Sequence, residues 1–380
     1  MKWRVRSVDN RGGMDFSVLK KRYIGLDILR VVSALVVCMF HTTIHLGCDY
    51  GIMHGLSKMG AVFMTAFFML SGFSLFINWG RHSLSDISNI KQFYKKRFWG
   101  IMPMYWVACM IFILYVLVMR EDTLLRTIAL APIETFGLQS VFSSLFGFSH
   151  NGGTWFISCI LICYFVYPLL QEIIKNINMK SRIWIMVFLI AVLLYSPIIV
   201  HFCKLQTLYS NPFFRLLEFM IGMILASLKL DFNESRFIKK FICNWITVII
   251  VSVIMIVFVT IAVRLDIAVD NYMLYSWICL PCFIVILYGL SGIESKKMSK
   301  SKILTMMSGA SYVFFLAQLY SNNISMKIIN AGNIEANSIK MAIGWGVCIV
   351  ITIVLRFIEI AIKKLLEKRI LGPREQARTN

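Results

Sequence analysis

Ten long apolar runs, separated by short polar segments, follow one another along the chain. Each run is close to the roughly 20 residues with which an α-helix crosses a hydrocarbon layer about 30 Å thick. Inside lipid, only helices and closed β-barrels satisfy every backbone hydrogen-bonding group. The pattern therefore predicts an all-α, polytopic integral membrane protein with about ten transmembrane helices. The predicted spans are residues 24–47, 59–78, 100–119, 154–174, 183–201, 212–228, 243–263, 272–291, 303–321 and 339–360.

The overall composition agrees with this pattern. Hydrophobic residues make up 58% of the 380 residues, and charged residues make up 15%. A typical soluble domain has about 25% charged residues. The composition therefore excludes a soluble protein of two or three domains.

The net charge of +20 would suggest nucleic-acid binding in a soluble protein. Here the basic residues follow the predicted topology instead. Of the 39 Lys and Arg residues, 29 lie in segments on one side of the predicted membrane and seven on the other, with Arg30, Arg215 and Arg356 inside spans. Basic residues accumulate in the cytosolic segments of membrane proteins. We therefore expect both termini in the cytosol and no nucleic-acid partner.

Residues 120–153 are the one ambiguous stretch of this topology. They are fairly apolar, but they contain Arg126 and Glu134, and also Pro132 and Gly137, which disfavour a long helix. A full span here would move every later loop to the opposite side and violate the charge asymmetry. We therefore expect an interfacial or re-entrant segment on the outer side.

No repeat, low-complexity tract or long soluble insertion interrupts the spans. The predicted organisation is a basic cytosolic tail over residues 1–22, a membrane domain over 23–360 and a basic cytosolic tail over 361–380. The first span is expected to act as its own signal anchor, because a polar and basic segment precedes it and no small-residue cleavage site follows. Any chemistry must then lie in the membrane domain or its short loops.

Ionisable side chains are costly inside a membrane and are candidates for function. The first span has four of them, Asp27, Arg30, His41 and His45. Arg30 and His41 are eleven positions apart, which at about 100° and 1.5 Å per residue puts them on one face of a helix, about 16 Å apart. The four residues therefore form a polar stripe that runs from the cytosolic end toward the outer half of the membrane.

Two interpretations of this stripe are open. In the structural one, Asp27 and Arg30 form an interfacial ion pair, and His41 and His45 make hydrogen bonds between helices. In the functional one, His41 accepts a proton near neutral pH and the guanidinium of Arg30 binds phosphate. A phosphate-binding end about 16 Å from a base suits an elongated donor whose charged end stays near the cytosol.

Leu26, Asp27, Arg30 and His41 resemble the opening motif of the membrane acyltransferase-3 family, which includes bacterial surface-polysaccharide O-acetyltransferases. Further motifs follow in the family's order and cover nearly all of the chain. They are Ser71-Gly72-Phe73 closing the second span, the basic patch Lys95-Lys96-Arg97 followed by Pro103, Thr154-Trp155-Phe156 opening the fourth span, Arg215 with Glu218 and Gly222, and Ser311-Tyr312 with Gln318.

The resemblance implies a multi-pass protein of the bacterial plasma (inner) membrane. It also implies a membrane O-acyltransferase that moves an acyl group, expected to be acetyl, from acyl-CoA to a hydroxyl of a cell-surface polysaccharide or glycolipid. Acetyl-CoA would then be a co-substrate, with no bound cofactor and no metal, and the glycan or glycolipid would be the acceptor.

Within this scheme His41 is the candidate general base. Asp27 is grouped with it in the catalytic set, as a residue that orients Arg30. Arg30 and Arg97, with Lys95 and Lys96, are the candidates for binding the phosphates of coenzyme A. The positive-inside rule explains the two lysines about equally well.

Six further residues are expected as possible lining of the site, each with a structural alternative. Ser71 adjoins Gly72 at a close helix approach, and Arg215 and Glu218 at helical spacing are able to neutralise each other. Gln318 stands where the family commonly has His, and Gln cannot titrate. The six are Ser71, Trp155, Arg215, Glu218, Tyr312 and Gln318.

Two other functional classes remain as alternatives. Buried Asp, Arg, His and Glu also serve proton coupling in secondary transporters, although the sequence lacks the inverted repeats with paired broken helices that such proteins often have. The second alternative is a non-catalytic glycan or lipid flippase. The presence of both Arg30 and His41 favours the enzyme.

Overall fold

The computed structural model describes residues 22–80, 82–141, 149–203, 208–231, 241–265, 276–293, 298 and 300–370. Every regular element within these ranges is helical. The α-helices are α1 (Ile24–Leu46), α2 (His54–Lys58), α3 (Phe63–Trp79), α4 (Ile87–Val118), α5 (Leu124–Phe136), α6 (Trp155–Asn176), α7 (Met179–Cys203), α8 (Pro212–Asp231), α10 (Trp245–Arg264), α11 (Ser276–Gly292), α13 (Lys302–Ala331) and α14 (Asn337–Ile370).

The prediction of an all-α polytopic membrane protein is confirmed. Within the described ranges, eight helices are long and apolar enough to cross a membrane. Each of the other two predicted spans coincides with a helix, namely α8, which carries Arg215 and Glu218, and α11, which has 17 residues. The first four residues of the eighth predicted span, 272–275, lie outside the described residues.

Three of the helices extend well beyond the predicted spans. Helix α4 begins at Ile87 rather than 100, α13 ends at Ala331 rather than 321, and α14 continues to Ile370 rather than 360. Hydropathy detects only the part of a helix that suits lipid, whereas the helix itself continues until a cap or a breaker ends it. Lys95, Lys96 and Arg97 therefore lie on a continuous helix and not in a loop.

Asp86 caps the N-terminus of α4. Its side chain accepts hydrogen bonds from the hydroxyl and the backbone N–H of Ser88, and these bonds lower the pKa of the Asp86 carboxyl. A carboxylate at this position satisfies an N–H group that has no partner within the helix and also complements the helix dipole. The cap explains why the helix starts thirteen residues before the predicted span.

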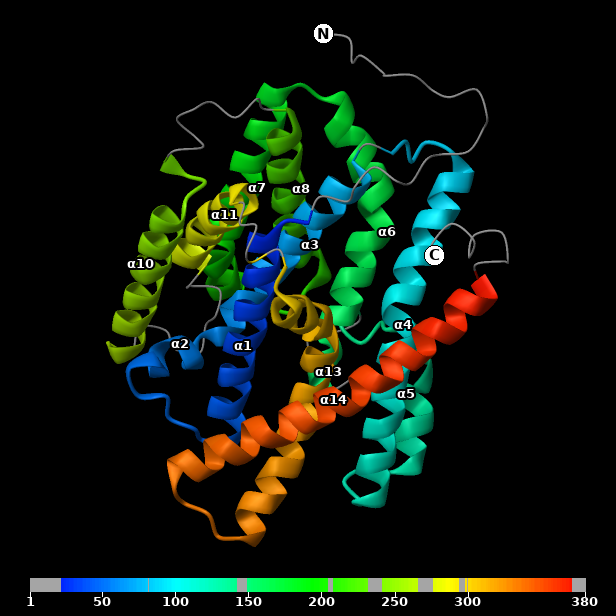
Figure 1. Cartoon of the computed structure of the whole chain (residues 1–380), viewed down its shortest axis with the longest axis vertical. Helices are drawn as coiled ribbons and strands as arrows, with labels where there is room; N and C mark the ends of the chain where they lie inside the picture. The colour runs from blue at the N-terminus through cyan, green and yellow to red at the C-terminus, as the bar shows by residue number, and fades with distance from the viewer. Residues whose placement is uncertain are drawn as a thin grey trace.

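The ambiguous stretch 120–153 contains α5. This helix has 13 residues and is therefore about 20 Å long, short of the roughly 30 Å needed to cross a bilayer. Figure 1 shows α5 beside α4, at the end of the bundle where α4 finishes. The described part of the stretch thus fits the expectation that it is not a full span.

Helices α3 and α8 make the closest contact in the bundle. A Cβ atom on Gly72 would lie 2.0 Å from the backbone oxygen of Phe219, and one on Gly222 would lie 1.9 Å from that of Met69. Small residues permit such close approach between helices inside membranes. In Figure 1 α10 and α11 flank this centre on one side, α4 and α5 on the other, and α14 crosses the bundle obliquely.

Gly222→Ala should destabilise the protein by forcing α3 and α8 apart. Overpacking of this kind costs about 1–3 kcal/mol. The measurement is the apparent Tm of the purified protein in detergent. Gly346→Ala on α14 is the matched control, because nothing lies within 4 Å of its Cβ position. Equal Tm values for the two variants would contradict the proposed role of the close contact.

Candidate active site

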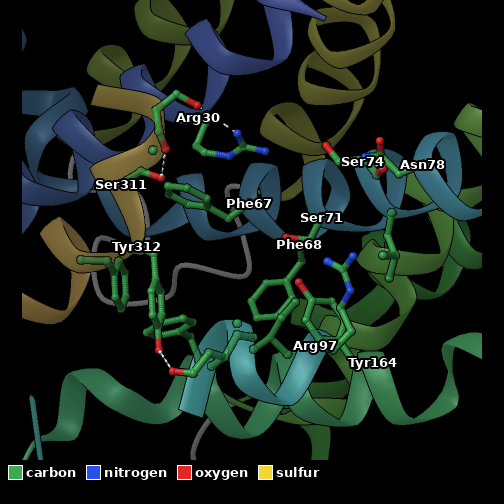
Figure 2. Close-up of a pocket in the computed structure, with 18 of the residues that line it drawn as sticks. Arg30, Phe67, Phe68, Ser71, Ser74, Asn78, Arg97, Tyr164, Ser311 and Tyr312 are labelled. Carbon is green, nitrogen blue, oxygen red and sulfur yellow. Dashed lines mark hydrogen bonds between the residues drawn. The ribbon is translucent and has the colours of Figure 1, made fainter. Parts of the chain in front are cut away.

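A cavity of ≈ 440 Å³ lies between α1, α3, α4, α6, α13 and α14. Figure 2 shows its lining, with the guanidinium groups of Arg30 and Arg97 pointing into it from α1 and α4. The volume falls in the range of about 300–1,000 Å³ typical of ligand pockets. Five of the residues expected from sequence contribute to the lining: Arg30, Ser71, Lys96, Arg97 and Tyr312.

One end of the cavity is strongly basic. Among the described residues, its lining includes Arg30, Lys96, Arg97 and Lys363, against the one carboxylate of Glu359. Glu359 is already paired with Lys363 at 2.6 Å and also with Arg356. The excess positive charge, supplied by α1, α4 and α14, suits an anionic ligand.

Arg30 is held in place by Asp27 and Ser308. Arg30 Nη1 donates to Ser308 Oγ at 3.0 Å and to Asp27 Oδ1 at 3.2 Å, and Ser308 Oγ donates to Asp27 Oδ1 at 2.6 Å. Arg22 adds a second pair with Asp27 at 2.6 Å. Asp27 does not line the cavity, so its contacts fit a residue that orients Arg30 rather than one that touches a ligand.

Arg97 lies among aromatic rings. Its guanidinium carbon is 5.7 Å from the ring centroid of Tyr164, 5.8 Å from that of Phe93 and 6.0 Å from that of Trp79. Among the described residues, Arg97 Nε has no hydrogen-bond partner and the side chain pairs with no carboxylate. The aromatic rings stabilise the cation while leaving donors for a ligand. The neighbouring Lys95 is exposed and lies outside the lining.

Along α3 the cavity lining extends from Met64 to Asn78, which at 1.5 Å per residue corresponds to about 21 Å. Away from the basic end the walls are largely aromatic and include Phe67, Phe68 and Phe156. The cavity is therefore elongated, with charge at one end and apolar walls at the other.

His41 lines a separate, much smaller cavity of ≈ 10 Å³, a volume sufficient for about one water molecule. Asn151, Thr154, Phe315 and Gln318 also line it. Within the described part of the chain, the Nδ1 atom of His41 and the Oε1 atom of Gln318 are buried without hydrogen-bond partners. The His41 ring stacks on His45 with centroids 5.7 Å apart. Two residues that line this small cavity thus each have a buried polar atom without a partner in the described chain.

A family model described as an acyltransferase domain matches residues 23–358. The chain belongs to the acyltransferase-3 family. It is therefore a membrane acyltransferase, and this assignment favours catalysis over the transporter and flippase alternatives. No curated protein and no solved structure matches the chain.

Arg215 and Glu218 of this acyltransferase lie behind the cavity wall and not in it. Arg215 Nη1 donates to both carboxylate oxygens of Glu218 at 2.8 Å, and Thr65 Oγ1 donates to Glu218 Oε1 at 2.8 Å. The guanidinium also contacts the rings of Trp155 and Phe68, at 5.3 and 5.5 Å. Phe68 lines the cavity, whereas Trp155, Arg215 and Glu218 do not. The buried pair is mutually neutralised and supports the wall through Phe68.

Sequence reasoning missed several lining residues of the acyltransferase. Glu359 and Lys363 follow Arg356 at helical spacing, a signal that was available in the last span. Phe156 belongs to the motif that opens the fourth span but was not expected to line the site, and Ser308 and Phe315 carry no charge or helical pairing that would mark them. Their role emerges only when α6 and α13 are packed against α1.

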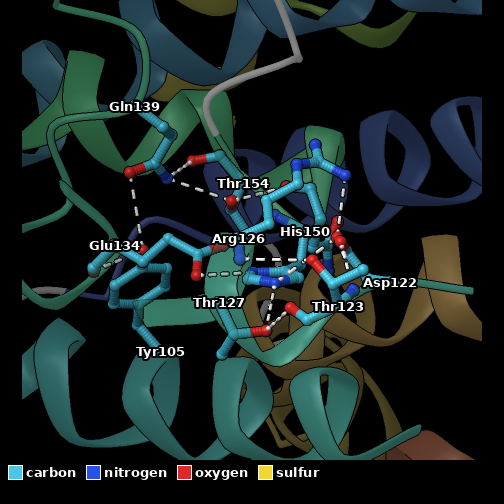
Figure 3. Close-up of polar contacts among 10 residues, drawn as sticks. Tyr105, Asp122, Thr123, Arg126, Thr127, Glu134, Gln139, His150 and Thr154 are labelled. Carbon is cyan, nitrogen blue, oxygen red and sulfur yellow. Dashed lines mark hydrogen bonds and ion pairs between the residues drawn. The ribbon is translucent and has the colours of Figure 1, made fainter. Parts of the chain in front are cut away.

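A second polar network holds the loop that borders His41 (Figure 3). His150 Nδ1 lies 2.8 Å from Glu134 Oε2, and the His150 backbone N–H donates to Glu134 Oε1 at 2.7 Å. His150 Nε2 lies 3.1 Å from Thr127 Oγ1. Gln139 Nε2 donates to the backbone oxygen of Thr154 at 2.7 Å. The network ties the loop that carries Asn151 and Thr154 to α5 and the turn after it.

His150→Ala should therefore destabilise this acyltransferase. It leaves the buried Glu134 carboxylate without its imidazole partner, and removing one partner of a buried hydrogen bond costs about 1–3 kcal/mol. The measurement is again the apparent Tm in detergent. The control is Glu121→Ala, which breaks the pair of Glu121 with Lys327, whose side chains are 37% and 44% exposed. Loss of such an exposed pair costs little stability. A Tm for His150→Ala that equals that of the control would contradict this account of the network.

Proposed function

We propose that this acyltransferase moves an acetyl group from acetyl-CoA to a hydroxyl of a cell-surface polysaccharide or glycolipid, with His41 as general base. The observation that carries the proposal is the elongated cavity, which has a basic end at Arg30, Lys96 and Arg97 and whose other end adjoins the small cavity of His41. The charge distribution and the length of this cavity suit a thioester carried on a long arm with phosphates at the far end.

The basic end supports coenzyme A as the donor. Guanidinium groups form strong, charge-assisted hydrogen bonds with phosphate. Arg30 is already oriented by Asp27 and Ser308, and Arg97 has an Nε–H donor without a partner in the described chain. Because positively charged segments favour the cytosolic side, this end would face the compartment that contains acyl-CoA.

In the proposed reaction, the neutral imidazole of His41 takes the proton of the acceptor hydroxyl, and the hydroxyl oxygen attacks the thioester carbonyl. The new C–O bond forms and the C–S bond breaks. The departing sulfur of coenzyme A takes the proton back from the imidazolium, so that the products are an ester and free coenzyme A. Gln318 borders the same small cavity but has no titratable proton, which supports His41 as the group that carries out both transfers.

The acceptor class and the bacterial plasma membrane are proposed from the motifs that this chain shares with surface-polysaccharide O-acetyltransferases. The position of His41 supports an acceptor that arrives from the outer side. His41 is in the last two turns of α1, and the loop at Asn151–Thr154 covers it next to the start of α6.

His41→Ala should abolish acetyl transfer. General-base catalysis contributes about 10²–10⁴-fold to a rate, so we expect a loss of at least that lower value. Membranes containing wild-type or variant protein at equal folded levels are supplied with radiolabelled acetyl-CoA and a host glycan extract, and both label in glycan and free coenzyme A are measured. His54→Ala, on the same side but outside both cavities, is the control. Wild-type activity in His41→Ala would rule out the proposed base.

Arg97→Gln should raise the KM for acetyl-CoA with little effect on kcat. A hydrogen bond to a charged group is worth about 1.5–3 kcal/mol, which corresponds to an increase of about 10- to 150-fold. The matched control is Lys95→Gln, which removes a nearby positive charge outside the lining. Equal KM values for the two variants would show that Arg97 does not bind acetyl-CoA and that the basic patch serves only to orient the protein in the membrane.

A further inference from the structure

The large basic cavity and the small cavity of His41 are neighbours that share a lining residue. Of the residues that the structure describes, Phe315 alone lines both cavities. It lies on α13, one helical turn before Gln318, which borders only the His41 cavity, and one turn after Tyr312 and Ser311, which border only the large one. The Phe315 ring therefore stands at the boundary between the proposed donor site and the proposed base.

Phe156 completes this boundary from α6. The rings of Phe156 and Phe315 meet edge to face, with centroids 4.2 Å apart and an interplanar angle of 74°. Phe156 also contacts the ring of Tyr312 at 6.2 Å, and Tyr312 is fixed by the hydrogen bond that its hydroxyl donates to the backbone oxygen of Ile101 at 3.0 Å. Phe156 thus lies between two aromatic rings. The Tyr312 ring is fixed by a hydrogen bond, whereas the Phe315 ring makes only an aromatic contact.

The pair of Phe156 and Phe315 is the aromatic contact at the boundary of the two cavities. The two rings meet edge to face, and a phenylalanine ring has no polar group through which a hydrogen bond would hold it in place. The His41 cavity of ≈ 10 Å³ is too small for a thioester carbonyl with its methyl group. The carbonyl therefore meets His41 only when the Phe315 ring turns aside, and the space that this ring vacates limits the size of the acyl group.

We propose that Phe315, backed by Phe156, is the gate between the donor cavity and His41, and that its ring restricts transfer to short acyl chains. This inference rests on the proposed function, because it presupposes an acyl thioester in the large cavity. It makes Phe315 a specificity-determining residue, whereas the basic end of the cavity determines binding of the coenzyme.

Phe315→Ala tests the gate in full-length protein in membranes. Release of free coenzyme A is measured with acetyl-, butyryl- and hexanoyl-CoA in the presence of the glycan extract, and binding of radiolabelled coenzyme A is measured in parallel. Wild type should prefer acetyl-CoA. A difference of one methylene in a pocket changes kcat/KM by about 10- to 200-fold, so Phe315→Ala should raise the ratio of hexanoyl to acetyl turnover at least about tenfold while coenzyme A binding is unchanged.

Phe314→Ala is the matched control. Phe314 is the adjacent residue of α13, but its ring faces Trp345 at 6.4 Å and it lines neither cavity. Phe315→Leu is the second variant, in case the alanine variant does not fold, and should raise the ratio by less. Phe315→Trp should lower acetyl turnover while coenzyme A still binds.

The outcomes separate the gate from the function on which it rests. If wild type turns over acetyl-CoA while Phe315→Ala and Phe315→Leu keep the chain-length ratio of Phe314→Ala, the gate is overturned and the acyltransferase reaction stays intact. Equal use of acetyl- and hexanoyl-CoA by wild type also overturns it. A wild type that binds no coenzyme A and releases none from any thioester overturns the proposed donor and the gate together.

Discussion

Inside a membrane bundle, the hydrogen bonds that water would give an arginine must come from other protein groups. The partners of Arg30 therefore determine the arrangement of the site. Asp27 and Ser308 supply the oxygen atoms that the guanidinium needs, and Ser308 belongs to α13 rather than to α1. The contact therefore fixes which helix lies beside α1 and at what height. Eleven residues further along α1 is His41, and ten residues further along α13 is Gln318. Both line the same small cavity, as expected for two helices that run in the same direction from a common anchor.

The ionisable residues inside this bundle fall into two groups that are distinguished by their hydrogen bonds. Arg215 and Glu218 bond to each other and to Thr65 and contact aromatic rings, so their charges are already neutralised within the protein. Arg97 Nε and His41 Nδ1 lack partners among the described residues. Buried polar atoms without partners are rare, because each costs about 1–3 kcal/mol. Arg97 and His41 each line one of the two cavities, so a ligand bound there would supply the missing partners.

Prediction from the sequence succeeded where the governing physics is local to one helix. The ten spans follow from hydropathy, and the common face of Arg30 and His41 follows from the helical repeat. It could not distinguish Arg97, which lines the cavity, from Lys95, which is exposed two residues away, because the rotation of α4 is set by packing against other helices. The sequence also does not reveal the contact of Phe156 with Phe315, because these residues lie far apart in the chain and both are apolar residues in predicted spans. The start of α4 at Ile87 was missed because a polar helical extension has no hydropathy signal.

The identity of residue 318 has a consequence for the proposed chemistry. Among the described residues that line the small cavity, His41 is the one titratable side chain, and the others are Asn, Gly, Thr, Phe, Leu and Gln. A second base or acid at position 318 would allow one group to take the hydroxyl proton and another to protonate the sulfur. With Gln there, the proposed scheme assigns both transfers to His41, which would require the leaving sulfur to come within reach of the ring that activates the hydroxyl. This requirement brings the thioester to His41 rather than leaving it at the basic end, and it agrees with a cavity that extends along α3 and ends at a single aromatic side chain.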